Sequence, residues 1–146
     1  MLRSKRLEVV LNLEERREQA ALDELTAARQ RVDQLRQHLD QLRRYQADYR
    51  EQMRQGQQGV VPVSRLQGWQ AFIAQLNQVV AQQELQLQSA LKAFEECRAK
   101  WQQAYERRRG MERYIASCRE REQRAEDARE QKAMDEAAAR AVTRRR

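Results

Sequence analysis

Apolar residues recur in alternating steps of four and three along residues 7–53. An apolar spacing of about 3.5 residues held over several heptads is typical of a left-handed coiled coil, so this pattern predicts a long helix with one buried seam. Only Glu14, Glu18 and Gln46 are polar within it. The seam positions are Leu7, Leu11, Glu14, Glu18, Ala21, Leu25, Ala28, Val32, Leu35, Leu39, Leu42, Gln46, Tyr49 and Met53.

A second seam with the same spacing follows, and Gln83 and Arg108 interrupt it. Neither helix is stable alone in water with its seam exposed, so the two seams are expected to cover each other. The positions of the second seam are Trp69, Ile73, Leu76, Val80, Gln83, Leu87, Ala90, Phe94, Cys97, Trp101, Ala104, Arg108, Met111, Ile115 and Cys118.

The segment between the seams contains Gly56, Gly59 and the only proline, Pro62. Proline lacks the amide that a continuing helix needs and favours extended geometry at the preceding residue. Ser64 and Gln67 form a Ser-x-x-Gln pattern that predicts a capping box at the start of the next helix. We therefore expect an all-α fold, a single antiparallel coiled-coil hairpin over residues 1–146, with helices at 4–54 and 65–140, a turn at 55–64 and a frayed basic tail at 141–146.

Symmetry about this turn predicts the register. It places Leu7 near Met111 and Glu14 within about one turn of Arg108, where a charge pair inside the seam would select this alignment. The alternative is that these polar side chains reach out to water. Past Cys118 the seam phase falls on polar or small residues among many opposite charges, so the second helix is expected to be longer than the first and to overhang it.

Composition limits the classes of protein. Charged residues make up 35% of the chain, aromatic residues 5%, and the mean hydropathy is −1.05, which favours a thin seam over a globular core. The net charge of +7 favours acidic partners. No apolar run approaches the roughly 20 residues of a membrane span, and the N-terminus does not have the pattern of a signal peptide. Cys97 and Cys118 lie too far apart on one helix to form a disulfide, which indicates a reducing cytoplasm.

Catalytic chemistry finds little support in the residues. His38 is the single histidine and lies in a charged helical stretch, so neither a catalytic triad nor a tetrahedral metal site is expected. Gly56-Gln57-Gln58-Gly59 resembles a nucleotide-clamping GxxG loop, but that loop needs surrounding strands and a turn needs glycine in any case. We expect a protein that is not an enzyme and that binds no cofactor or metal.

Aromatic residues gather on both sides of the turn. Tyr45 and Phe72 fall outside the seam phase, and Leu76 and Val79 extend the face of Phe72 in helical steps. An apolar patch beyond what two helices need to cover each other is a candidate docking face. The alternative is a wider seam near the turn that buries the same residues within the hairpin.

Three segments together resemble the FliJ family, the small coiled-coil component of the bacterial flagellar type III export apparatus. They are Leu39-Asp40-Gln41-Leu42-Arg43-Arg44-Tyr45-Gln46-Ala47-Asp48-Tyr49-Arg50, Trp69-Gln70-Ala71-Phe72-Ile73-Ala74-Gln75-Leu76 and Gln131-Lys132-Ala133-Met134-Asp135-Glu136. The resemblance implies a stalk in the centre of the export ATPase (FliI) ring that links the ring to the export gate protein FlhA and escorts emptied export chaperones. It also implies a monomer, cytoplasmic and held at the inner membrane only through partners.

The resemblance assigns two surfaces. The gate-binding face transfers to His38, Leu42, Tyr45, Tyr49, Phe72, Leu76, Val79 and Gln83. The ATPase-binding end is the open end of the hairpin, where the residues assigned are Arg3, Lys5, Arg6, Arg107, Arg108, Arg109, Lys132, Met134, Asp135 and Glu136; the cations among them suit an acidic ring lumen.

Other functions and assemblies stay open at this point. One is the equivalent stalk of a virulence type III secretion system, which shares the hairpin. Another is a basic coiled-coil protein that binds nucleic acid, although no aromatic stacking platform lies among the charges; we expect no nucleic-acid partner. A third is an intermolecular coiled-coil dimer without a hairpin.

Overall fold

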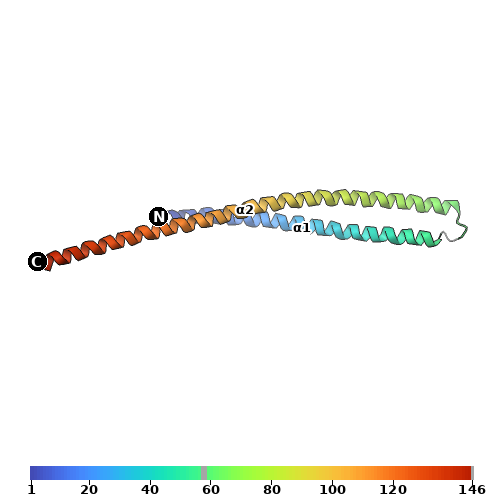
Figure 1. The fold of residues 1–146 in the computed structure, drawn as a ribbon. Coiled ribbons are helices and arrows are strands. Elements are labelled where there is room, and N and C mark those ends of the chain that lie inside the picture. The colour runs from blue at the N-terminus through green and yellow to red at the C-terminus, as the bar shows by residue number, and fades with distance from the viewer. Residues whose placement is uncertain (57–58, 146) are drawn as a thin grey trace. The chain divides into compact units, whose positions relative to one another are not determined.

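The computed structural model describes residues 1–56 and 59–145, which form two α-helices and no strand (Figure 1). Helix α1 spans Arg3–Gly56 and contains 54 residues. Helix α2 spans Val63–Arg145 and contains 83 residues. The predicted all-α hairpin with a longer second helix is confirmed.

Contacts divide the chain into two compact units. Unit 1 combines Met1–Ala20 with Trp101–Arg146, and unit 2 consists of Ala21–Lys100. Each unit therefore contains one segment of α1 packed antiparallel against one segment of α2. None of the described helices has a stretch long and apolar enough to cross a membrane.

The predicted seams are confirmed by burial. Every seam position named above, in both helices, is buried or half-buried. The most buried apolar side chains are Val32, Leu35, Leu39, Leu76 and Val80 in unit 2 and Ile115 and Cys118 in unit 1. The core is thin because each seam side chain is covered by a single facing helix, so the 3.5-residue apolar period is what holds each unit together.

The start of α2 differs from the prediction. The carbonyl of Pro62 accepts hydrogen bonds from the amides of Arg65 (3.1 Å) and Leu66 (3.2 Å), so the helix begins at Val63. Ser64 lies inside the first turn, and its predicted role in a capping box is wrong, because the Pro62 carbonyl already accepts the first helical bonds. Gly59 has a φ of +133°, a conformation that favours glycine. Gln57 and Gln58, part of the predicted turn, lie outside the described residues.

The register also differs from the prediction. In unit 1, Arg119 pairs with Glu8 at 2.5 Å, so Leu7 lies near Arg119 and not near Met111. In unit 2, Gly56 packs on the ring of Trp69, where a Cβ would come within 3.0 Å of Cη2. α1 therefore ends opposite Trp69, and the first turn of α2 extends beyond that contact. The symmetric alignment assumed that the end of α1 faces the start of α2. It is wrong because Gly56 at the end of α1 faces Trp69, beyond the first turn of α2.

The C-terminal part of α2 is longer than predicted. The helix continues to Arg145 instead of ending at residue 140. An alanine-rich stretch with high helix propensity precedes this end, and the hydroxyl of Thr143 donates to the carbonyl of Ala139 at 3.0 Å. Residues 123–145 are all exposed. Pairs such as Arg124 with Glu120 (2.6 Å) lie along this part of the helix, as the charge pattern predicted.

Candidate interaction surfaces

An aromatic cluster joins the two helices of unit 2 near their connection. Phe72 of α2 lies between two tyrosines of α1, with its ring centroid 4.4 Å from that of Tyr49 and 6.1 Å from that of Tyr45. The Tyr45 ring meets Phe72 edge to face, the favoured geometry for an aromatic pair. Phe72 is half-buried, whereas Tyr45 keeps 52% of its surface exposed. The cluster therefore both stabilises the hairpin and presents a tyrosine to solvent.

The opposite side of the same segment is polar. Arg43 pairs with Glu84 at 3.0 Å, and Asn77 accepts hydrogen bonds from Gln46 at 2.7 Å and from Arg50 at 3.4 Å. His38 lies seven residues before Tyr45, and Val79 seven residues after Phe72, so each shares a helical face with its aromatic neighbour. Unit 2 thus has an aromatic flank, which we define as His38, Tyr45, Phe72 and Val79, and a polar flank on its other side.

The residues assigned to the gate-binding face differ in accessibility. His38, Tyr45 and Val79 are exposed, and Leu42, Tyr49, Phe72 and Gln83 are half-buried. Leu76 retains only 7% of its surface because it packs in the seam. Both sequence-based readings of the aromatic residues therefore hold in part: the seam widens to take in Phe72, and an exposed aromatic flank remains beside it.

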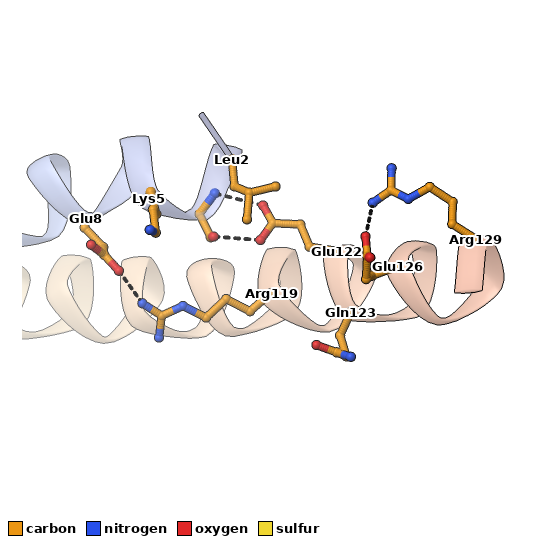
Figure 2. Close-up of a pocket in the computed structure, with 9 residues that line it drawn as sticks. Leu2, Lys5, Glu8, Arg119, Glu122, Gln123, Glu126 and Arg129 are labelled. Carbon is orange, nitrogen blue, oxygen red and sulfur yellow. Dashed lines mark hydrogen bonds and ion pairs between the residues drawn. The ribbon is translucent and has the colours of Figure 1, made fainter. Parts of the chain in front are cut away.

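The N-terminus of α1 is capped by a side chain of α2. The carboxylate of Glu122 accepts hydrogen bonds from the Ser4 hydroxyl (2.7 Å) and from the Ser4 amide (3.0 Å), which are the two dashed lines that end at the labelled Glu122 in Figure 2. The first amides of a helix have no partner within the helix, so the carboxylate satisfies a free donor and favours the positive end of the helix dipole. The Ser4 hydroxyl, then the Ser4 amide, lower the pKa of Glu122, and the charge of Arg119 acts in the same direction. Ser4 is 3% exposed.

A shallow hollow of about 560 Å³ surrounds this cap (Figure 2). Its charges are largely paired: Glu8 with Arg119, and Glu126 with Arg129 at 2.7 Å. Among the described residues, no three His, Cys, Asp or Glu side chains gather as a metal-binding set.

Unit 1 also contains a polar layer inside its seam. Nε of Arg108 donates to Glu18, and Nη1 donates to Glu112 at 2.6 Å. Glu18 first, and Glu112 second, raise the pKa of Arg108. Glu14 instead pairs with Arg17 of its own helix at 3.2 Å, and its Oε2 atom is buried without a hydrogen-bond partner. The predicted pairing of Glu14 with Arg108 is therefore wrong, since the observed register brings Glu18 to the arginine.

The residues assigned to the ATPase-binding end all lie in unit 1. One of them, Arg108, packs in the seam, with 19% of its side chain exposed. The others are exposed, and Arg109 lies 3.7 Å from Glu112. The guanidinium of Arg3 lies over the ring of Tyr114 at 5.5 Å from its centroid. Those that are exposed are Arg3, Lys5, Arg6, Arg107, Arg109, Lys132, Met134, Asp135 and Glu136, and Asp135 accepts a hydrogen bond from Gln131 at 3.1 Å.

Sequence reasoning missed the Ser4–Glu122 cap, although a signal was present. Ser4 precedes Leu7 by three residues and so continues the first seam toward the N-terminus, while Glu122 continues the second seam past Cys118. Two polar residues in seam phase at the ends of antiparallel helices are in a position to pair.

The comparison with known families agrees with these features. The model of the family described as Flagellar FliJ protein matches residues 4–146. The chain belongs to the FliJ family. Members of this family are non-enzymatic components of flagellar type III export, and a general role in that export extends to this chain. No curated protein and no solved structure matches it.

Proposed function

We propose that this FliJ-family chain is the central stalk of the export ATPase (FliI) ring and links the ring to the export gate protein FlhA. The observation that carries the gate half of the proposal is the aromatic flank. Tyr45 and Val79 remain 52% and 40% exposed beside the half-buried Phe72, although they lie next to a seam that could have covered them. Exposed aromatic and aliphatic groups beside a rigid helix pair are typical anchors of a protein interface.

The ring half of the proposal is supported by charge in unit 1. Lys5, Arg6 and Arg107 are exposed, and in the described part of the chain none of the three makes an ion pair. Unpaired cations on a helical surface steer association with an acidic partner and contribute more to the association rate than to tight contact. The proposal places these residues, with the exposed segment from Lys132 to Glu136, in the ring.

Two further parts of the proposal follow from the family. Emptied export chaperones bind the same chain and are returned to the export gate. The protein is a monomer that works in the cytoplasm, at the inner face of the cytoplasmic membrane, and is held there through its partners.

A pull-down with FlhA tests the gate half. Tyr45→Ala combined with Val79→Ala removes exposed groups of the aromatic flank without changing the buried seam. We expect it to weaken FlhA binding by about tenfold or more, as for hot-spot residues. The matched control is Arg43→Ala with Arg50→Ala on the polar flank, which should retain binding. Equal binding of both variants would refute the assignment of this flank.

A pull-down with FliI at low salt tests the ring half. Charge reversal at Lys5, Arg6 and Arg107 should weaken association and reduce its dependence on salt. Charge reversal at Arg43, Arg44 and Arg50 in unit 2 is the control with the same change in net charge. If the two variants lose FliI to the same extent, the effect is one of net charge and the assigned end is wrong.

A further inference from the structure

The face of α1 that points away from α2 in unit 1 carries a second line of positions in the seam spacing, with the apolar Val9 and Leu13 at its centre. Its positions are Arg6, Val9, Leu13, Arg16 and Ala20, and each position from Val9 on follows a seam position by two residues. Two residues correspond to about 200° around a helix, so this line lies opposite the seam that packs on α2. Val9 is 70% exposed and Leu13 46%. Nothing in the described part of the chain covers them.

Charges on this segment are sorted between its two sides. The carboxylates turn toward α2 or its flanks: Glu8 pairs with Arg119, Glu18 with Arg108, and Glu14 is buried beside Arg17. Glu15 also falls nearer the α2 side by helical position. The outward side carries the exposed cations Arg6 and Arg16, whereas Lys5 lines the hollow that also contains Glu122 of α2. It is therefore apolar and cationic, without a carboxylate among residues 1–20.

The arrangement of the cations indicates what kind of partner fits. Arg6 and Arg16 lie within the apolar line itself, and a hollow of about 360 Å³ lined by Val9, Val10, Asn12, Leu13 and Arg16 lies on this side of α1. A helix that lies on a lipid surface has a broad apolar face, often with aromatic residues, and keeps its cations on the polar face. A line one residue wide in the 4-3 spacing is instead the geometry of a coiled-coil seam, in which a polar or charged residue at a core position sets the register.

We propose that this outer face of α1 binds an amphipathic α-helix from an acidic partner protein, whose leucine-type side chains pack on Val9 and Leu13 and whose carboxylates pair with Arg6 and Arg16. The partner helix and α2 would occupy opposite sides of α1. Positions of opposite charge at a coiled-coil seam set both register and partner choice. This surface is separate from the aromatic flank and shares Arg6 with the end that we propose to lie in the ring. The inference does not depend on which component of the export system supplies the helix.

The test uses the full-length protein and two designed helical peptides of about three heptads, long enough to span the line. One peptide places Leu opposite the apolar positions and Glu opposite Arg6 and Arg16; the other replaces these Glu residues with Lys. We expect the Glu peptide to bind in a salt-dependent manner. The Lys peptide should bind at least about tenfold more weakly. Val9→Asp with Leu13→Asp should abolish binding, whereas Leu85→Asp, at an exposed leucine of unit 2, should not.

Charge reversal gives a gain-of-function test. Arg6→Glu with Arg16→Glu should weaken binding of the Glu peptide and create binding of the Lys peptide. Non-specific hydrophobic binding cannot produce this exchange of preference. Far-UV circular dichroism of each variant shows whether α1 remains helical, so a loss of binding can be separated from a loss of folding.

Three outcomes would overturn the inference. The first is equal binding of both peptides, or binding unaffected by the Val9 and Leu13 variant. The second is binding to phosphatidylglycerol vesicles that depends on Val9 and Leu13 while neither peptide binds, which would make the face a membrane surface. The third is concentration-dependent self-association that the same variant abolishes, which would make the occupant a second copy of this chain.

Discussion

The carboxylate of Glu122 accepts hydrogen bonds from both the hydroxyl and the amide of Ser4, so that a side chain of α2 caps the first turn of α1. Helix caps are usually supplied by the residue that begins the helix. Here Leu2 occupies that place and has no side-chain acceptor, and the cap comes from Glu122, which lies 118 positions after Ser4. The order of the first turn of α1 thus depends on the pairing of the two helices.

This cap predicts a pH dependence. The pKa of Glu122 lies below its ordinary value of 4.5 in the folded protein, so the ionised carboxylate favours the folded state. This stabilisation is fully present above pH 4.5 and is lost as the pH falls through the folded pKa. The amide chemical shift of Ser4, followed by NMR, should move with that titration. In Glu122→Gln the Ser4 amide should no longer titrate in this range; an unchanged titration would show that another group controls it.

Glu14 predicts a stabilising substitution. It occupies a seam position, and its Oε2 atom is buried without a partner. Glu14→Leu removes the cost of burying that oxygen and fills the seam, so the free energy of unfolding should rise by about 1 kcal/mol. Urea unfolding followed by circular dichroism measures the change. Glu15→Leu, at the exposed neighbouring position, should have little effect; a lower stability of Glu14→Leu would contradict the prediction.

The pair of Glu18 with Arg108 predicts a rescue. Glu18→Arg alone places two like charges in the seam and should lower the thermal midpoint of unfolding, as should Arg108→Glu. The double exchange should recover only part of the loss, because the glutamate placed at position 108 would lie beside Glu112. Glu14→Arg with Arg108→Glu reproduces the pairing predicted from symmetry and should recover nothing. Rescue by the Glu14 exchange, and not by the Glu18 exchange, would restore the symmetric register.

The aromatic cluster predicts unequal costs. Phe72 is half-buried and contacts both tyrosine rings, so Phe72→Ala should reduce the free energy of unfolding by about 2 kcal/mol, less than for a fully buried phenylalanine. Tyr45 is 52% exposed and makes one of these contacts, so Tyr45→Ala should cost less than about 1 kcal/mol. Equal losses in urea unfolding would mean that Tyr45 is part of the core and not a surface group.

The two helices and their seams could be predicted from periodicity. Ala21, Ala28 and Gln46 are weak evidence taken singly, yet all three are half-buried as their place in the heptad requires. The helix ends were predicted less well, because Pro62 and Ser64 both have a recognised role at a helix start and only the observed hydrogen bonds choose between them. The exposure of the aromatic flank was also undecided, because period alone does not say how wide a seam is.

The amino-acid sequence by itself determined that this chain forms two long helices and that the second helix is longer than the first. It also determined which face of each helix is buried. Helical period is a local property, and the burial of apolar side chains at that period leaves little choice. Tertiary structure alone decided the register, and with it the partner of Arg108, the cap of Ser4 by Glu122 and the buried oxygen of Glu14. Sliding one helix past the other by a heptad exchanges similar apolar layers, so only the contacts between particular side chains distinguish one alignment from the next.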